Sequence, residues 1–222
     1  MLRPRAVLFD AYGTLFDVYS VAQLAEELYP GHGEKISLLW RDKLIDYTRI
    51  VSMSGRWRPF RELVRAGLRF AVQRLGLAQS DASEERLVRQ HDRLTAFPEV
   101  LPTLEELKSR GVRAGVLSNG DPQMLSDVVA NAGLCDLLDP LLSVSQVRRY
   151  KTDPACYSLG PAALGLAASE ILFVSSNGWD AIGATWYGYT TLWVNRAGLP
   201  LEALDTEPSR TARSLRDTLT FF

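Results

Sequence analysis

The sequence predicts an α/β protein: a doubly wound, Rossmann-like parallel sheet with an all-helical cap inserted after its first strand. Two observations predict this fold class. From residue 98 onward, short apolar runs alternate with helical stretches of about ten residues, which is typical of βαβ units and a parallel sheet. Residues 17–96 instead show helical periodicity without an intervening strand pattern. We therefore expect a core of residues 1–16 and 97–222 and a helical cap of residues 17–96.

The first strand is expected at Ala6–Phe9, where four apolar residues end abruptly in Asp10. A short apolar run of this kind is typical of a buried central strand in a parallel sheet. Gly13 and Thr14 follow as a turn, so Asp10 is expected at the carboxyl edge of the sheet, where open α/β sheets bind ligands. Taken alone, Asp10 is also compatible with a role as a turn residue or helix cap.

The insertion is expected to contain four helices, each with a boundary signal in the sequence. Ser20 is predicted to cap the first, and Pro30 with Gly31 ends it. The others are expected over Glu34–Val51, from Pro59 to Leu75, and over Glu84–Thr95. A row of arginines at the third helix predicts a solvated face, formed by Arg56, Arg58, Arg61, Arg65, Arg69 and Arg74.

In the core, the pattern predicts further helices and strands in alternation. The expected helices are Pro102–Arg110, Pro122–Ala132, Pro154–Leu164 and Trp179–Tyr187. The expected strands are Val112–Leu117, Leu141–Val144, Ile171–Val174 and Thr191–Val194. The stretch Val147–Lys151 resembles a strand, and a weakly patterned tail closes the chain.

Polar side chains follow three of the predicted strands, and one lysine follows the strand-like stretch. Because parallel strands end at one edge of the sheet, these groups are expected to converge although they are far apart in the sequence. Any one of them alone is also a common helix cap. The converging set comprises Asp10, Thr14, Ser118, Asn119, Lys151, Ser175, Asn177 and Asp180.

Composition and charge exclude several classes of protein. The formal net charge of −1 lacks the basic excess of a nucleic-acid-binding protein. Cys135 and Cys156 show neither metal-ligand spacing nor a disulfide framework, which favours a reducing, cytoplasmic setting. No stretch approaches the roughly 20 apolar residues of a membrane helix, and the N-terminal apolar run is too short for a signal peptide. We expect neither a nucleic-acid nor a membrane partner.

Five motifs are spread along nearly the whole chain, including the expected cap. They are DAYGTLFD (Asp10–Asp17), LWR (Leu39–Arg41), LSNG (Leu117–Gly120), YK with a later tyrosine (Tyr150, Lys151, Tyr157) and FVSSNGWD (Phe173–Asp180). Together they resemble the haloacid dehalogenase superfamily, and more narrowly the L-2-haloacid dehalogenases. The narrower resemblance depends mainly on Tyr12, Arg41, Asn177 and Trp179.

Tyr12 separates two branches of this superfamily. Phosphatases that resemble this fold carry a second Asp two residues after the nucleophile as acid/base, whereas a phenol with an ordinary pKa of about 10 transfers protons poorly near neutrality. These phosphatases also bind Mg²⁺, which prefers several oxygen ligands including carboxylates. Here only Asp10 and Asp180 are anionic candidates, and Lys151 reduces the need for a cation. We therefore expect a reaction without a metal or other cofactor.

The resemblance implies a two-step hydrolysis of short L-2-haloacids. Asp10 attacks C2, expels the halide and forms an ester; water then attacks the Asp10 carbonyl carbon and releases a 2-hydroxy acid with inverted configuration at C2. Lys151 would keep Asp10 ionised and stabilise charge during ester hydrolysis, and Tyr157 would support Lys151. The residues expected to orient Asp10, Lys151 and the hydrolytic water are Thr14, Ser175, Asn177 and Asp180.

The resemblance also implies how the substrate and the departing halide are held. Arg41 and Asn119, with the ring edge of Phe60, would receive the halide. Ser118 and backbone amides after the nucleophile would hold the substrate carboxylate. The apolar walls that exclude bulk water are expected from Tyr12 and Trp179.

Two alternatives stay open at this point. One is a Mg²⁺-dependent phosphatase or phosphonate hydrolase of the same superfamily, and the other is a weakly active relative that binds small acids. Asp42, next to Arg41, would repel both the haloacid and the halide if it faced the pocket. The resemblance further implies a homodimer, with the cap helices as its contact surface.

Overall fold

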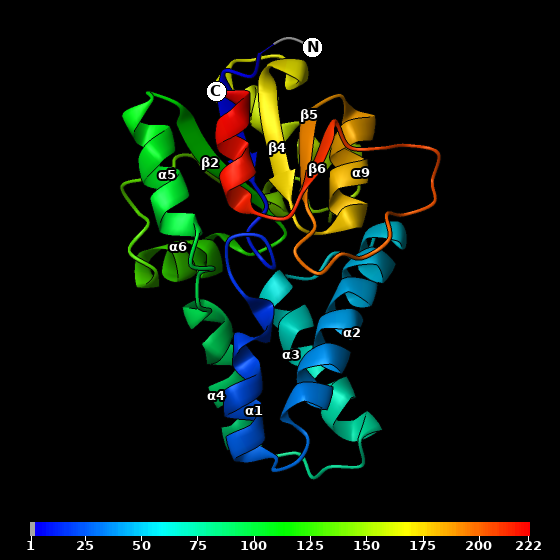
Figure 1. Cartoon of the computed structure of the whole chain (residues 1–222). Coiled ribbons are helices and arrows are strands. Elements are labelled where there is room, and N and C mark those ends of the chain that lie inside the picture. Colours follow the sequence, from blue (N-terminus) through cyan, green and yellow to red (C-terminus); the bar gives the residue numbers. More distant parts are fainter. Residues whose placement is uncertain (1–2) are drawn as a thin grey trace.

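Six parallel strands form one sheet in the computed structural model, which describes residues 3–222 of the chain (Figure 1). They are β1 (Ala6–Phe9), β2 (Arg113–Ser118), β3 (Leu141–Ser143), β4 (Ile171–Ser175), β5 (Thr190–Val194) and β6 (Arg210–Ala212). Their order in the sheet is β3-β2-β1-β4-β5-β6, with β1 paired to β2 and β4. The strand order reverses between β1 and β4, and open α/β sheets bind ligands at such a switch point.

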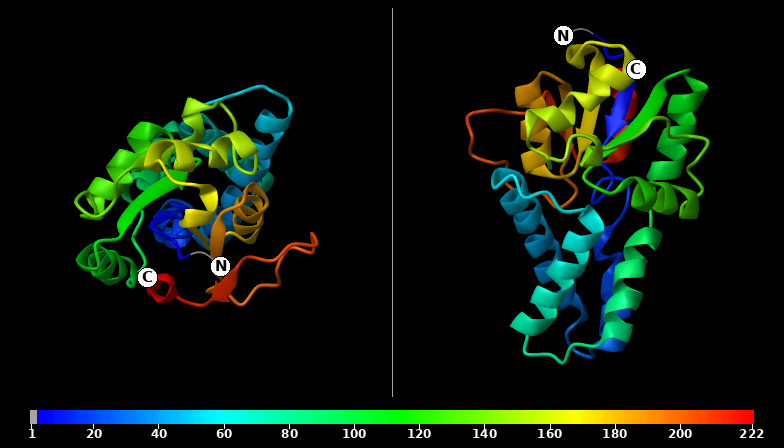
Figure 2. Two further views of the ribbon diagram at one scale, coloured as in Figure 1. Left: turned by 90° about the horizontal axis from the view of Figure 1, so that it is seen from above. Right: turned by 180° about the vertical axis from the view of Figure 1, so that it is seen from behind.

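Helices cover both faces of this sheet. They are α5 (Val100–Ser109), α6 (Pro122–Asn131), α7 (Pro154–Tyr157), α8 (Leu159–Leu164), α9 (Gly178–Tyr187) and the 3₁₀ helix Leu215–Phe221. α5 and the last 3₁₀ helix lie in front of the sheet in Figure 1, and α7, α8 and α9 lie on its other face (Figure 2, right). A strand covered on both faces is mostly apolar, and every residue of β1, β4 and β5 is buried.

Helices also fill the segment between β1 and α5. They are α1 (Ala22–Leu28), α2 (Gly33–Met53), α3 (Phe60–Arg74) and α4 (Asp81–Gln90), with 3₁₀ helices at Val18–Val21 and His91–Arg93. α2 packs so closely on α3 that a Cβ at Gly67 would lie only 3.2 Å from the Trp40 ring. This helical half lies beneath the carboxyl ends of the strands (Figure 1). The division of the chain into a core and a separate cap domain stays a prediction.

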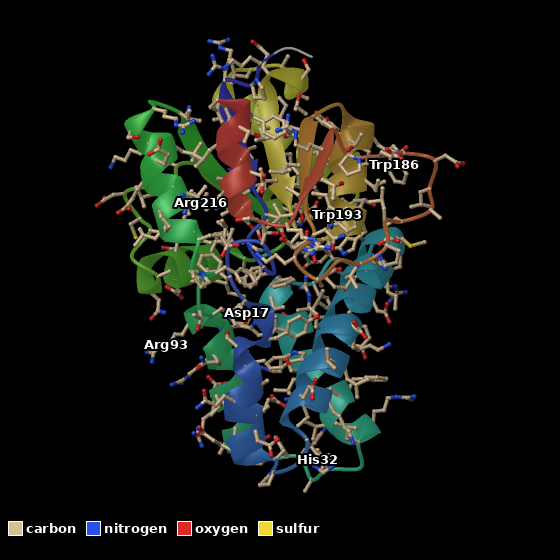
Figure 3. All side chains as sticks on the ribbon, in the orientation of Figure 1. Asp17, His32, Arg93, Trp186, Trp193 and Arg216 are labelled. Atoms are coloured by element: carbon tan, nitrogen blue, oxygen red, sulfur yellow. The ribbon has the colours of Figure 1, made fainter. Side chains whose placement is uncertain are left out.

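Two antiparallel segments join the halves. The Asp17 amide donates to the Thr95 carbonyl (2.8 Å), and the Phe97 amide donates to the Leu15 carbonyl (3.0 Å). Residues 15–17 and 95–97 therefore form a short ribbon; Figure 3 marks Asp17 at this junction. Because the ribbon directly follows the turn after Asp10, the position of Asp10 and the orientation of the halves are linked.

Two local predictions are wrong. Asp17, not Ser20, caps the first helical turn, since its carboxylate accepts the Tyr19 amide (2.9 Å). A carboxylate is the stronger cap because its charge lies at the positive end of the helix. Lys151 does not follow a strand: the 3₁₀ helix Val144–Gln146 and a turn precede it, because the VRRY stretch is too polar for a buried strand.

The other predicted core elements are present, with ends shifted by at most two residues. The helix predicted over residues 154–164 is interrupted at Ser158, and the tail adds β6 and the last 3₁₀ helix. The arginine row is not simply solvated, because Arg65 and Arg69 each lie 2.6 Å from Glu84 of α4. Within residues 3–222, no helix has both the length and the apolar character needed to cross a membrane.

Candidate active site

Asp10 lies directly after β1, buried where the sheet meets the helical half. Its amide donates to the Val174 carbonyl (2.9 Å), which extends the pairing of β1 with β4. Lys151 Nζ lies 3.2 Å from Asp10 Oδ1. Oδ2 accepts from Thr14 Oγ1 (3.0 Å) and from Asn177 Nδ2 (2.8 Å). Three loops thus fix the carboxylate, and Oδ2 is held by one donor more than Oδ1.

A buried lysine connects Asp10 with a second carboxylate. Lys151 Nζ lies 2.9 Å from Asp180 Oδ2, and Tyr157 OH donates to Asp180 Oδ1 (2.8 Å). Burial alone would lower the pKa of Lys151, but the charges of Asp10 and Asp180 raise it above its ordinary value. Burial, together with the Asp180 charge, raises the pKa of Tyr157 well above its usual range. Lys151 is therefore a cation enclosed between two carboxylates, with Tyr157 as a neutral donor behind them.

Arg41 reaches this network from α2. Its Nη2 donates to Asn177 Oδ1 (2.9 Å) and to the Tyr12 carbonyl (3.3 Å). Asn177 Nδ2 donates to the same carbonyl (3.2 Å), so Asn177 bridges Arg41 and Asp10. The turn that presents this carbonyl requires a φ of +91° at Gly13, a backbone conformation that favours glycine.

Tyr12 occupies the position two residues after Asp10. Its buried ring packs on Phe60 (centroid distance 5.5 Å) and meets His91 edge-on (6.4 Å). Its hydroxyl lies so close to Gly120 that a Cβ there would be 3.1 Å away. Burial raises the pKa of Tyr12 above its ordinary value. Tyr12 therefore neither exchanges protons near neutrality nor offers a negative charge to a metal.

Three polar side chains at strand ends accept hydrogen bonds from backbone amides of the loops instead of bonding Asp10. Ser118 Oγ accepts the amide two residues later (3.2 Å). Ser175 Oγ accepts the Asn177 amide (3.1 Å) and so orients the residue that bonds Asp10. Asn119 Oδ1 accepts the Lys151 amide (3.1 Å), which directs its Nδ2 group the other way.

A surface cavity of about 520 Å³ opens beside this network, and Arg41 and Asn177 line it. Trp179 lines it too, with the Arg49 guanidinium 5.5 Å from its ring centroid. Trp179 therefore belongs to the mouth of the site, whereas Tyr12 lies in the buried interior. Asp42 is exposed and lines the mouth.

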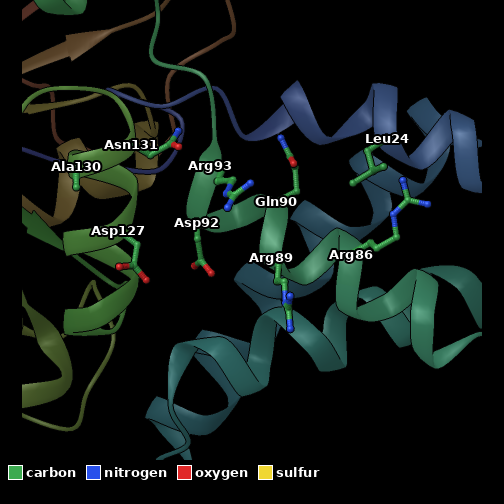
Figure 4. A pocket seen from close by; sticks show the side chains of 9 residues that line it. All are labelled: Leu24, Arg86, Arg89, Gln90, Asp92, Arg93, Asp127, Ala130 and Asn131. Atoms are coloured by element: carbon green, nitrogen blue, oxygen red, sulfur yellow. The ribbon is translucent and has the colours of Figure 1, made fainter.

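A second cavity of about 590 Å³ lies between α4 and α6 (Figure 4). Arg86, Arg89 and Arg93 line one side, and Asp127 and Asn131 of α6 line the other. The three arginines are exposed, so solvent screens their charges. Its lining includes no residue of the network around Asp10.

The donor set around Asp10 does not suit Mg²⁺. This ion demands near-octahedral oxygen ligands, carboxylates among them. The carboxylates of Asp10 and Asp180 instead share the Lys151 ammonium, and Tyr12 brings no charge. In the described part of the chain, no group of three or more histidine, cysteine, aspartate or glutamate side chains could hold a metal ion.

Two polar residues outside the motifs also contact this region. Asp121, after β2, accepts the Phe60 amide (2.9 Å) and the Arg61 amide (2.8 Å) at the start of α3. Arg196, after β5, donates to the Thr14 carbonyl (3.0 Å). Each follows the end of a predicted strand, which is the one signal in the sequence that could have indicated them.

The sheet topology and the closed carboxylate–lysine site define an α/β enzyme whose chemistry takes place between the sheet and a helical half. The model of the haloacid dehalogenase-like hydrolase family matches residues 4–188. The chain belongs to this family, which confirms the resemblance predicted from its motifs.

The relatives within this family include dehalogenases of 2-haloacids. The (S)-2-haloacid dehalogenase of Pseudomonas sp. (strain YL) is 44% identical over 218 residues, which are 98% of this chain and 94% of the relative. The crystal structure of the L-2-haloacid dehalogenase RSc1362 has a TM-score of 0.97 at 53% identity and covers 99% of both chains. The L-2-haloacid dehalogenase of Xanthobacter autotrophicus with chloropropionic acid covalently bound has a TM-score of 0.91 at 35% identity, covering 97% of this chain and 96% of that one. These matches confirm the predicted fold class.

Proposed function

We propose that this protein hydrolyses the carbon–halogen bond of short L-2-haloacids and releases 2-hydroxy acids with inverted configuration at C2. The observation that carries this proposal is the buried Asp10 carboxylate, with Oδ2 held by two donors and Oδ1 beside Lys151. Similarity to an (S)-2-haloacid dehalogenase over nearly the whole chain supports the same reaction. Halide leaves as a stable anion, so the reaction needs no acid at the position of Tyr12.

In the first step, Asp10 Oδ1 attacks C2 in line with the carbon–halogen bond, forms an ester and releases halide. Thr14 and Asn177 hold Oδ2, so the less constrained oxygen faces the substrate. Lys151 at 3.2 Å stabilises the negative charge of the carboxylate before attack.

The substrate is held by residues from both halves. Arg41 of α2, Asn119 through its Nδ2 group and the Phe60 ring edge receive the halide. Ser118 and the backbone amides after Asp10 hold the substrate carboxylate. The buried Tyr12 ring and Trp179 at the mouth limit the access of bulk water.

In the second step, water attacks the carbonyl carbon of the Asp10 ester. Oδ2 becomes the oxyanion, and Thr14 Oγ1 and Asn177 Nδ2 already donate to it at 3.0 and 2.8 Å, as in an oxyanion hole. Collapse restores the carboxylate and releases the 2-hydroxy acid and one proton. Asp180, the carboxylate left beside Lys151 while Asp10 is esterified, is the base for that proton.

Residues 17–96 act as the cap in this proposal, because α2 and α3 bring Arg41 and Phe60 to residues that follow the strands. No metal or other cofactor takes part. The thiols of Cys135 and Cys156 are free, which fits a reducing cytoplasm. The homodimer implied by the resemblance stays a prediction.

The test measures halide release from L- and D-2-chloropropionate, with and without EDTA. We expect release from the L enantiomer alone, with (R)-lactate as product and no effect of EDTA. Asp10→Ala should lower activity by about 10⁴-fold or more, because no group remains to form the ester. The control is Asp139→Asn, whose side chain is 85% exposed, and it should retain full activity.

Four other results of the activity assays would contradict the proposed reaction or one of its parts. Loss of activity in EDTA would overturn the metal-independent route, and an active Asp10→Ala would overturn the assigned nucleophile. Phosphate-ester hydrolysis without halide release would favour the Mg²⁺-dependent phosphatase. Inactivity in both assays would favour a weakly active relative that binds small acids.

A further inference from the structure

Arg196 follows β5 and reaches back to the turn after β1. Its Nη2 donates to the Thr14 carbonyl (3.0 Å), and its Nη1 donates to Ser176 Oγ (2.7 Å) and to the Gly13 carbonyl (3.4 Å). Its Nε donates to Glu99 Oε1 (2.8 Å). One guanidinium thus joins three segments that are far apart in the sequence.

The plane of this guanidinium is well constrained. Arg196 Cζ lies 3.9 Å from the centroid of the Phe97 ring, and the side chains of Arg196 and Glu99 are each only 21% exposed. A stacked guanidinium with Nε and both Nη atoms engaged holds its partners in a fixed geometry, unlike an exposed arginine. Phe97 belongs to the ribbon that returns from the helical half, where its amide donates to the Leu15 carbonyl. Arg196 therefore fastens the turn after Asp10 to this ribbon.

The two loops that Arg196 holds are the loops that fix Asp10 Oδ2. Thr14 Oγ1 donates to Oδ2 at 3.0 Å and accepts the Ser176 amide at 2.8 Å. Ser176 directly precedes Asn177, which donates to the same oxygen at 2.8 Å. A shift of either loop would change the angle at which the carboxylate meets its substrate.

We propose that Arg196 is a positioning residue that keeps Thr14 and Asn177 on Asp10 Oδ2. This inference rests on the proposed role of Asp10 as nucleophile. Arg196 touches the reacting carboxylate only through these two loops, so its loss changes the reacting geometry rather than substrate binding. Lysine cannot replace it, because a single ammonium lacks the planar fork that serves three partners.

The test compares the steady-state kinetics of wild type, Arg196→Ala and Arg196→Lys on L-2-chloropropionate. Misplacement of a reacting group by about 1 Å costs about 100-fold in rate, so Arg196→Ala should lower kcat by about that factor with KM within about threefold. Arg196→Lys should recover little of this loss. Added guanidinium should restore part of the kcat of Arg196→Ala and leave wild type unchanged.

Arg110→Ala is the matched control. Arg110 also binds one carboxylate (Glu106) and one backbone carbonyl (Leu219), but lies outside the network around Asp10. It should leave kcat unchanged. An equal kcat for wild type and Arg196→Ala would overturn the inference, and so would a large rise in KM without rescue by guanidinium.

A second measurement needs no turnover. Hydrogen exchange at the Ser176 amide and over residues 13–16 should be faster in Arg196→Ala than in wild type or Arg110→Ala. If Arg196→Ala does not fold, Arg196→Lys allows the same comparison. If wild type releases no halide but Arg196→Ala still exchanges faster than wild type, the proposed function is overturned and the positioning of Asp10 is supported. If exchange in Arg196→Ala equals that in wild type, the positioning itself is overturned.

Discussion

At the residue scale, His91 shows how strongly the interior beside the site excludes charge. Its ring meets Trp40 and Tyr12 edge-on, with centroid distances of 4.6 and 6.4 Å. Burial, helped by the charges of Arg41 and Arg61, lowers the pKa of His91 to about 3. Neither ring nitrogen has a hydrogen-bond partner among the described residues. The imidazole therefore fills space as a neutral ring.

This burial predicts a stability that depends on pH. The ordinary pKa of histidine is 6.5, so between pH 6.5 and about 3 the unfolded chain binds more protons than the folded one. Stability is thus complete above pH 6.5 and falls as the pH drops toward 3. Urea unfolding should show a loss of about 1.4 kcal/mol from this residue between pH 7.5 and 5.5.

His91→Phe should remove this loss. At pH 7.5 it should be at least as stable as wild type, because it deletes an unpaired buried polar group. His32→Gln, which removes the other histidine in the loop before α2, should retain the wild-type slope. A His91→Phe variant with the wild-type slope would contradict the assigned cause.

At the element scale, the start of α3 is capped from the other half of the molecule. Pro59 at the N-cap position makes no side-chain cap bond. Asp121 after β2 supplies it, accepting the amides of Phe60 and Arg61 through its two carboxylate oxygens. A carboxylate suits this position because the first helical amides lack partners and the helix dipole is positive there. The same contact places the Phe60 ring against Tyr12.

Asp121→Ala should therefore affect both stability and substrate binding. Loss of a cap costs about 1–2 kcal/mol of unfolding free energy, and KM for L-2-chloropropionate should rise severalfold as Phe60 loosens. Asp121→Asn should recover part of both effects. Ser80→Ala, which removes the cap of α4, is the control and should lower stability without changing KM. An unchanged KM in Asp121→Ala would mean that other contacts position Phe60.

The same cap shows which features the sequence could predict. Buried strands are mostly apolar and ligand-binding residues follow them, so the sheet and the place of Asp10 after β1 were predictable from local patterns. Lys151 follows a 3₁₀ helix and a turn instead of a strand, and its meeting with Asp10 and Asp180 was indicated by the YK motif. Asp121 and Arg196 have partners on elements distant in the sequence. Those contacts depend on how the two halves pack, and no local periodicity records that packing.

At the scale of the whole molecule, the residues around Asp10 lie in an enclosed interior. Tyr12, Phe60 and Lys151 are each at most 4% exposed, although they come from both halves. The cavity of about 520 Å³ reaches this interior at Arg41 and Asn177, where the network meets solvent. In the proposed reaction, we expect a haloacid to enter through this mouth.

The charge at this mouth should affect the binding of an anionic substrate, because Asp42 lines the mouth. A unit charge about 8 Å away in water costs about 0.5 kcal/mol, a factor of about two. Asp42→Asn should therefore raise kcat/KM for L-2-chloropropionate about twofold at low salt with kcat unchanged, and the gain should vanish at about 0.5 M salt. Asp136→Asn, an exposed site outside the mouth, makes the same change of net charge and should have no effect. A larger gain that persists at high salt would mean that Asp42 turns into the interior during turnover.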